Sequence, residues 1–217
     1  SKFAEQQMFY NEAMIKAFKD GEDIHTATAR ALFGEQEITP ILRSRAKAVN
    51  FGIIYGISEY GLAKNLKISN SKARDYISTY FETYPEVKRY MDGNLSFAKE
   101  NGYISTLLGR KRRIRELSSS NYNLRTFGER AAMNMPLQGS SADIIKIAMV
   151  NIDKELENKN LNSKLILQVH DELVIETKED ELEIVKEILV RNMENVIKMK
   201  VPLVAEANYG KTWYDAH

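Results

Sequence analysis

Residues 43–56 read Arg-Ser-Arg-Ala-Lys-Ala-Val-Asn-Phe-Gly-Ile-Ile-Tyr-Gly, and this stretch decides how the rest of the chain is interpreted. Arg43, Lys47, Phe51 and Tyr55 follow one another at a spacing of four residues. On an α-helix that spacing places all four side chains in one slowly turning stripe, because residues i and i+4 lie on the same face. The stripe carries two cations toward its N-terminal end and two aromatic rings toward its C-terminal end.

Such a stripe suits a ligand with a polyanion at one end and a flat ring at the other, as in a nucleoside triphosphate. The rise from Arg43 to Phe51 is roughly 12 Å, and a helix N-terminus adds partial positive charge near the anion. Gly52 and Gly56 each cost about 1 kcal/mol inside a helix, which suggests that a backbone or a base approaches closely there. The alternative is an ordinary amphipathic helix, with its aromatic rings in the core and its cations at the rim.

The same residues form a longer pattern, Arg-(x)3-Lys-(x)3-Phe-Gly-(x)2-Tyr-Gly, that resembles the nucleotide-binding helix of the family A DNA polymerases. The resemblance implies that Arg43 and Lys47 hold the triphosphate of an incoming deoxynucleotide. It also implies that Phe51 packs on the base and sugar, and that Tyr55 lies beside the template base and checks pair geometry. Single-subunit RNA polymerases have a similar helix and stay open as an alternative.

A second signature of this family, Gly-Glu-Asp-Ile-His-Thr, lies upstream at residues 21–26. Taken alone, His25 is typical of a helix start or of a core histidine. The resemblance implies that His25 lies near the β-phosphate side of the nucleotide.

Residues 168–174, Gln-Val-His-Asp-Glu-Leu-Val, place three ionisable groups between apolar segments that favour strands. Charged groups at a tight turn between buried strands are costly unless water, a metal ion or a partner charge receives them. Adjacent carboxylates repel each other, and a divalent cation removes that conflict. Mg²⁺ is usually held by one or two carboxylates together with substrate phosphates. The alternative is a plain hairpin turn.

Family A polymerases carry one of their two metal-binding aspartates at a turn of this kind. The resemblance implies that Asp171 is that metal ligand, that Glu172 assists it, and that His170 contacts the primer end. It implies two Mg²⁺ ions in the intact enzyme and phosphoryl transfer by a two-metal mechanism. The catalytic residues expected in this chain are therefore Asp171, Glu172 and Lys47.

Two further segments are candidates for contacts with duplex DNA. Residues 109–115 contain five cations, including Arg110, Arg112 and Arg113, and form either a solvated loop or a sequence-independent contact to the phosphate backbone. Residues 129–139 match the family's duplex-contacting helix. Their polar residues can donate to the minor-groove acceptors that nearly every base pair presents: Arg130, Asn134 and Gln138.

The apolar spacing predicts an α+β fold. Helices are expected over 6–19, 27–33, from Pro40 with Thr39 as N-cap, and over 69–84, 85–100, 124–135, 140–157 and after 177–180. Strands are expected over 103–108, leading into a basic loop, and over 164–169, 173–176 and 201–207. The acidic stretch 179–187 is interpreted as a solvated helix face, and Trp213 as a core residue. By resemblance, residues 11–120 are a mostly helical fingers lobe, and residues 121–217 are a partial palm with a short antiparallel sheet and flanking helices.

Composition is that of a globular protein, with 217 residues, 43% apolar residues and a formal net charge of +1. The absence of Cys excludes a disulfide framework and a thiolate metal site. No apolar run reaches the ~18 residues of a membrane span, and the first residues lack the apolar core of a signal peptide. We therefore expect a cytoplasmic, nucleoid-associated protein without a membrane partner.

The resemblance covers residues 11–217 and fails over residues 1–10. Family A polymerases carry an Asp-x-Ser-x-x-Glu-Leu-Arg strand there, which supplies the other catalytic aspartate and the glutamate that excludes ribose. We therefore expect a fragment that is inactive alone and whose partners are primer–template DNA, deoxynucleoside triphosphates and the remaining polymerase chain, including the thumb and first palm strand. A non-catalytic DNA-binding module is the alternative, and would bind duplex without any effect of nucleotide or Mg²⁺.

Overall fold

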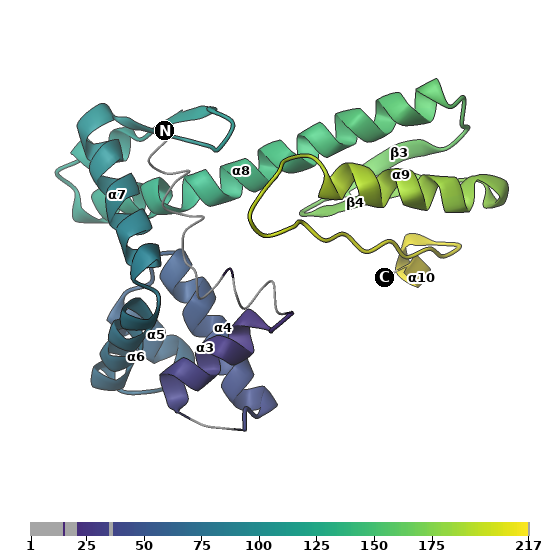
Figure 1. Ribbon diagram of the computed structural model, residues 1–217. Helices are drawn as coiled ribbons and strands as arrows, with labels where there is room; N and C mark the ends of the chain where they lie inside the picture. The colour runs from purple at the N-terminus through teal and green to yellow at the C-terminus, as the bar shows by residue number, and fades with distance from the viewer. Residues whose placement is uncertain (1–14, 16–20, 35–36, 217) are drawn as a thin grey trace. The chain divides into compact units, whose positions relative to one another are not determined.

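The computed structural model describes Ile15, residues 21–34 and residues 37–216 (Figure 1). Segment 1–10 falls outside these residues, and so does the helix expected over 6–19, except for Ile15, which is helical. The chain divides into two compact units, one up to Gln138 and one from Gly139 onward. The boundary between fingers and palm near residue 120 rests on sequence similarity and stays a prediction.

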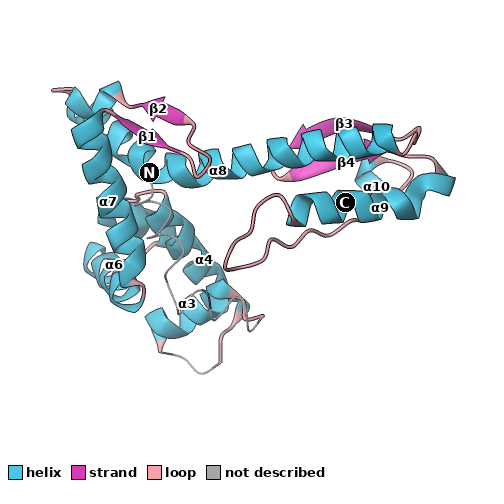
Figure 2. Ribbon diagram, turned by 45° about the horizontal axis from the view of Figure 1, so that its top comes forward, coloured by secondary structure: helices cyan, strands magenta, loops and turns pink. Residues whose placement is uncertain are grey.

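Helices dominate the first unit, and they appear in cyan in Figure 2. Hydroxyl side chains begin several of them, because Thr39, Ser58 and Ser69 each accept from the backbone N–H three residues on, at 3.3, 3.1 and 3.2 Å. The predicted start of a helix at Thr39 and Pro40 is confirmed. The helices before the first hairpin are α3 (Ile24–Phe33), α4 (Pro40–Ile54), α5 (Glu59–Leu66), α6 (Asn70–Thr83) and α7 (Pro85–Asn101).

The sequence analysis missed α5. Its start carries a clear signal, Ser58 before Glu59, but its eight residues are too few to display an apolar period. The helix predicted from residue 27 begins three residues earlier, at Ile24, because the side chain of Asp23 caps it.

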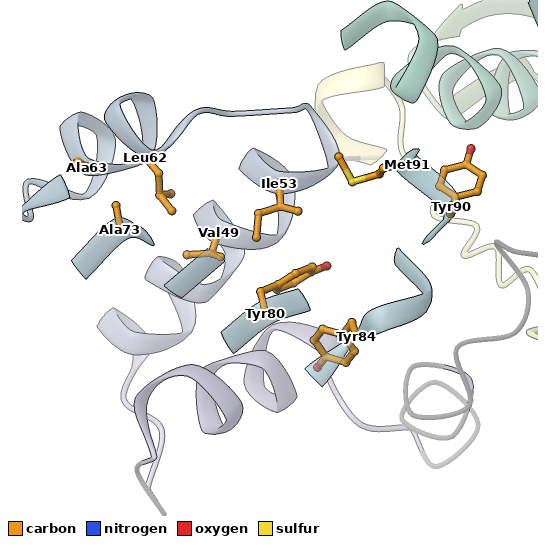
Figure 3. Close-up of a cluster of buried hydrophobic side chains, with 9 residues drawn as sticks. All are labelled: Val49, Ile53, Leu62, Ala63, Ala73, Tyr80, Tyr84, Tyr90 and Met91. Carbon is orange, nitrogen blue, oxygen red and sulfur yellow. The ribbon is translucent and has the colours of Figure 1, made fainter. Parts of the chain in front are cut away.

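The core of the first unit lies among α4, α5, α6 and α7 (Figure 3). Val49 of α4, Leu62 of α5 and Tyr80 of α6 are completely buried in it. The ring of Tyr84 packs edge-on against Tyr80 at a centroid distance of 5.0 Å. Because burial of each large apolar side chain contributes roughly 1.5–3 kcal/mol, this cluster fixes which face of α4 points inward.

A hairpin follows α7, with β1 (Tyr103–Ser105) antiparallel to β2 (Lys111–Arg113). The strand expected over 103–108 is therefore too long, and the expected basic loop is partly a strand. The chain reverses early because Gly109 adopts a φ of +88° and because the N–H of Thr106 donates to the carbonyl of Arg110 at 2.9 Å. Three of the basic residues, Lys111, Arg112 and Arg113, are consequently held on a paired strand.

Helix α8 (Tyr122–Asn158) runs without a break through Pro136, where two separate helices were expected. An interior proline loses one helical hydrogen bond and costs about 3 kcal/mol. Packing on both sides of the proline offsets this cost. Ala132 and Met135 are buried in the cluster that contains Ile104, while Met133 and Leu137 pack on the main core.

The second unit is a hairpin with two helical segments packed beside it (Figure 1). Strands β3 (Lys164–Val169) and β4 (Glu172–Glu176) pair antiparallel, as predicted. Its core joins Ile152 of α8, Leu173 of β4 and Ile188 of α9. The remaining elements are the 3₁₀ turns Arg115–Ser118 and Glu179–Glu181 and the helices α9 (Leu182–Glu194) and α10 (Trp213–Ala216).

Three expectations for the second unit are wrong. Residues 202–210 form no strand, although exposure alternates along 201–208 in a strand-like way, because no described strand pairs with them. Glu181 is not a solvated acidic residue but is 8% exposed, since it accepts hydrogen bonds from the loop that connects α8 to β3. Trp213 is not a core residue, because 46% of it is exposed.

Taken together, the described elements form an α+β fold, as expected. Among the described residues, no helix combines the length and the apolar character that crossing a membrane requires.

Candidate functional site

The Arg-Lys-Phe-Tyr stripe lies on the outward face of α4. All four side chains are exposed, and Phe51 and Tyr55 retain 46% and 45% of their accessible surface. The inward face carries the buried residues of the helix: Ala46, Val49, Asn50 and Ile53. The alternative of an amphipathic helix with its aromatic rings in the core is therefore wrong for this helix.

Arg43 is held by a bidentate ion pair to Asp23. Its Nε lies 2.8 Å from Oδ2 of Asp23, and its Nη2 lies 2.9 Å from Oδ1. The same carboxylate caps α3, because it accepts from the N–H and the hydroxyl of Thr26 at 2.9 and 2.7 Å. The Arg43 guanidinium, helped by Thr26, holds the pKa of Asp23 well below its usual range. One side chain thus ties the first turn of α3 to the cationic end of the stripe.

The rings of the stripe lie close to one another and to His25. Phe51 and Tyr55 stack at 6.4 Å with an interplanar angle of 15°, and the Nζ of Lys47 lies 5.9 Å from the centre of the Phe51 ring. His25 packs against Phe51 at 5.8 Å. The first unit therefore brings His25 against Phe51, which in turn lies beside Lys47 and Tyr55.

Burial lowers the pKa of His25, and the positive charges of Arg43 and Lys47 act in the same direction. The negative charge of Asp23 opposes them. The Nδ1 of His25 lies 2.9 Å from the side-chain amide nitrogen of Asn50, which comes from the inward face of α4. Burial and the nearby cations therefore disfavour the protonated imidazole, which lies between α3 and α4.

The stripe ends where α4 ends. The N–H of Gly56 donates to Ile53 and the N–H of Ile57 donates to Gly52, at 2.9 and 2.8 Å, which is the Schellman pattern of a helix C-terminus. Gly56 has a φ of +68°, and a Cβ there would lie 3.0 Å from Cγ of Arg130. The interpretation that both glycines lie inside a helix is therefore wrong for Gly56, whose close neighbour is a side chain of α8.

The residues expected at duplex DNA lie on the first unit. Arg130 and Gln138 on α8 are exposed, whereas Asn134 is partly buried. The Oδ1 of Asn134 finds no hydrogen-bond partner within the part of the chain that the structure describes. On the hairpin, Arg112 and Arg113 extend from β2, and the guanidinium of Arg110 is exposed just before it.

The acidic turn lies on the second unit. His170 and Asp171 form the two-residue connection between β3 and β4, and both are exposed. His170 adopts a φ of +53°, a left-handed conformation that is uncommon for a residue with a side chain. Gln168 donates to the carbonyl of His170 at 2.5 Å, and the indole of Trp213 donates to Oε1 of Glu172 at 2.7 Å.

The described residues contain no cluster of three or more His, Cys, Asp or Glu side chains that could by itself hold a metal ion. The exposed carboxylate of Asp171 nevertheless suits Mg²⁺, which prefers hard oxygen ligands and often takes one or two carboxylates plus phosphate oxygens. Glu172 is oriented by Trp213 and adds a second carboxylate beside it. The turn can therefore supply part of a Mg²⁺ site but not a complete one.

Three residues that shape these sites were not predicted from the sequence as part of them: Asp23, Asn50 and Trp213. A signal existed for the first, because Asp followed three residues later by Thr is typical of a helix start. For Asn50 the signal was a polar residue at a core position of the apolar period. For Trp213 no signal existed, since its partner lies 41 residues away in sequence.

The chain matches the family model described as DNA polymerase family A over residues 7–215. It is 53% identical over 207 residues to DNA polymerase I of Caldicellulosiruptor bescii, covering 94% of this chain and 24% of the relative. It is 48% identical to DNA polymerase I of Bacillus caldotenax, covering 95% of this chain and 24% of the relative. The chain thus spans about a quarter of the length of these curated relatives.

A solved structure agrees with these relatives. It is described as the POL domain of Pol1 from M. smegmatis in complex with DNA primer-template and dNTP, and it superposes with a TM-score of 0.91 at 41% sequence identity. The match covers 99% of this chain and 38% of that one. In sequence and in fold, the chain belongs to the family A DNA polymerases.

Proposed function

We propose that this chain supplies the nucleotide-binding fingers and part of the catalytic palm of a template-directed DNA polymerase. The intact enzyme would add deoxynucleoside triphosphates to the 3′ end of a primer in DNA replication and repair, which would place it at the nucleoid in the cytoplasm. The observation that carries the proposal is the exposed stripe of Arg43, Lys47, Phe51 and Tyr55 on α4. The names of the relatives and the bound ligands of the solved relative support it.

At the nucleotide, each part of the stripe has a distinct task. Arg43 and Lys47 bind the triphosphate, and His25 lies beside them to contact the β-phosphate side. Phe51 packs on the base and sugar, and Tyr55 lies beside the template base. The stacking of the two rings and their large exposed surface support these tasks, because a flat apolar face that is not covered by the protein is free to receive a base.

At the acidic turn, Asp171 would hold Mg²⁺ and Glu172 would assist, together with carboxylates from the rest of the enzyme. When bound, the two ions would supply the Lewis acidity for attack of the primer 3′-hydroxyl and for departure of pyrophosphate. His170 would contact the primer end. Its left-handed backbone supports a functional role, because strained conformations cluster at such sites.

On the duplex, Arg110, Arg112 and Arg113 would contact phosphates in any sequence. Arg130, Asn134 and Gln138 would donate to minor-groove acceptors, whose pattern varies little between base pairs.

Substitution of Lys47 tests the assignment of the stripe. In the polymerase that carries this sequence, Lys47→Ala should raise the KM for nucleotide and lower kcat by roughly 10²–10³, the usual loss for one electrostatic donor. Lys64→Ala removes an equally exposed lysine of the same unit and should change neither constant. Wild-type constants in Lys47→Ala would overturn the assignment. Duplex binding that no nucleotide affects would favour the non-catalytic DNA-binding module instead.

A further inference from the structure

A chain of buried polar side chains lies directly behind the stripe. Asn50 is only 5% exposed, although it directly precedes the exposed Phe51. Its amide nitrogen lies 2.9 Å from Nδ1 of His25, and its amide oxygen accepts from the hydroxyl of Thr28 at 3.1 Å. The hydroxyl of Tyr84 lies 3.4 Å from that of Thr28 and extends the chain into the core.

The two ends of the Asn50 amide determine which imidazole nitrogen carries the proton. In the structure the amide oxygen lies toward the hydroxyl of Thr28, which also donates to the carbonyl of Ile24 at 2.8 Å, and the amide nitrogen lies toward His25. An amide NH₂ group only donates hydrogen bonds, so in this orientation Nδ1 of His25 is the acceptor. A neutral imidazole has one N–H, and that proton then sits on Nε2.

We propose that Asn50 is a positioning residue that holds His25 in the neutral Nε2–H tautomer and so presents a hydrogen-bond donor to the phosphates bound by Arg43 and Lys47. The presentation of a donor to phosphate rests on the proposed nucleotide-binding function, whereas the position of the proton on His25 does not. The opposite tautomer would present a lone pair to the phosphates and repel them.

The surroundings of His25 support a neutral, oriented ring. The charged groups that face it are Asp23 at the start of α3 and Arg43 and Lys47 on α4. The ring of Phe51 lies 5.8 Å away at an angle of 44° and limits rotation of the imidazole. With two cations already present, a neutral donor adds directional recognition of a phosphate oxygen without a third positive charge.

The tautomer can be measured directly in the 217-residue chain. Nitrogen-15 NMR distinguishes protonated from unprotonated ring nitrogens, and the three histidines can be assigned by single substitutions. Above the histidine titration range, His25 should show a protonated Nε2 and an unprotonated Nδ1. A protonated Nδ1 in the wild-type chain would overturn the proposal without any variant having to fold.

The substitution Asn50→Asp tests whether Asn50 sets the tautomer. A carboxylate only accepts, so it should move the His25 proton to Nδ1 and weaken nucleotide binding about tenfold, as expected for loss of a hydrogen bond to a charged group. Asn94→Asp changes an equally buried asparagine on α7 and should leave the His25 tautomer unchanged. Retention of the Nε2–H form in Asn50→Asp would refute the role of Asn50.

A titration of the wild-type chain with a deoxynucleoside triphosphate separates this inference from the proposed function. If His25 has the Nε2–H tautomer but triphosphate shifts neither its signals nor those of Lys47, the nucleotide-binding function fails and the control of the tautomer by Asn50 stands. If triphosphate binds while His25 carries its proton on Nδ1, the function stands and the role of Asn50 fails.

Discussion

Asp23 and Glu181 are single carboxylates that each join separate segments of the chain. Asp23 caps α3 and holds Arg43 of α4, and Glu181 binds the loop that connects α8 to β3. In both cases the carboxylate accepts several hydrogen bonds, and in both cases its pKa is lowered as a result. Asp23 lies in the candidate nucleotide site, so its substitution should affect ligand binding. Glu181 has no part in that site, so its substitution should affect stability.

Substitution of Glu181 should remove a pH-dependent part of the stability. Glu181 accepts from the N–H groups of Asn162 and Ser163 at 2.8 and 2.9 Å and from the hydroxyl of Ser163 at 2.5 Å. These bonds, led by that from the Asn162 backbone, lower its pKa to about 2 from 4.5. A lowered carboxyl pKa stabilises the fold above the unfolded-state value, and this contribution is lost as pH falls from 4.5 toward 2.

Thermal unfolding of wild type and Glu181→Gln, from neutral pH down through that range, is the measurement. The variant should be less stable near neutral pH, and the difference should shrink as the solution is acidified. Glu183→Gln is the control, because Glu183 is exposed on the next turn and should leave the pH profile unchanged. A constant difference between wild type and Glu181→Gln at every pH would show that the charge of Glu181 does not matter.

Substitution of Asp23 by Asn should strengthen triphosphate binding. The carboxylate partly neutralises the guanidinium of Arg43, and an asparagine keeps the cap of α3 while removing the negative charge. The gain should be about threefold to fivefold at low salt and smaller at high salt, because both side chains are partly exposed. Nucleotide titration at two ionic strengths gives the result, with Glu59→Gln, which breaks the ion pair to Arg74, as control. Weaker binding would instead show that Asp23 is needed to position Arg43.

At the scale of elements, the end of α4 is where the Arg-Lys-Phe-Tyr stripe meets α8. Gly56→Ala should destabilise the first unit by about 1 kcal/mol for the left-handed backbone and by more for contact with Arg130 and Met133, which lie 3.0 Å from the added methyl position. Gly102→Ala is a matched control, since Gly102 has a φ of +72° but no neighbour within 4 Å. Urea unfolding of both variants measures the difference. Equal losses would mean that the packing against α8 contributes nothing.

The elements show what could be predicted from sequence and what could not. Caps and apolar spacing located α4, α6, α7, the β3–β4 hairpin and α9, because those signals are local. They did not show that α8 continues through Pro136, since this depends on burial of Ala132 and Met135 against distant segments. They also placed a strand at 201–207, where apolar alternation is present but no described strand is available to pair.

The candidate site, too, has a part that could be predicted from the sequence and a part that could not. The stripe of α4 could be read from a spacing of four residues, because a single helix displays it. The contacts between α3 and α4 could not be read from it, since Asp23 lies 20 residues from its partner Arg43 and His25 lies 25 residues from its partner Asn50. Contacts between separate helices depend on how the helices pack, which no local pattern specifies.

At the scale of the whole molecule, the stripe of α4 and the acidic turn lie on different units, and the acidic turn carries the adjacent acidic residues Asp171 and Glu172. Two-metal phosphoryl transfer requires ions held on both the attacking and the leaving oxygens. Residues 1–10 contain no Asp, and within the described residues no cluster of three metal-ligating side chains is present. A protein limited to residues 1–217 is therefore expected to bind nucleotide without using it.

Purified chain of residues 1–217, with primed template, all four deoxynucleoside triphosphates and Mg²⁺, should show no primer extension at catalytic concentrations. The same preparation should bind triphosphate, and this binding should weaken in Lys47→Ala, which shows that the lack of extension does not come from misfolding. Asp171→Ala should leave most of the binding intact, because in the proposed function the acidic turn takes part in the chemistry whereas Lys47 and Arg43 hold the phosphates. Robust extension that Asp171→Ala abolishes would contradict the prediction, since it would mean that these 217 residues complete a metal site without an upstream aspartate strand.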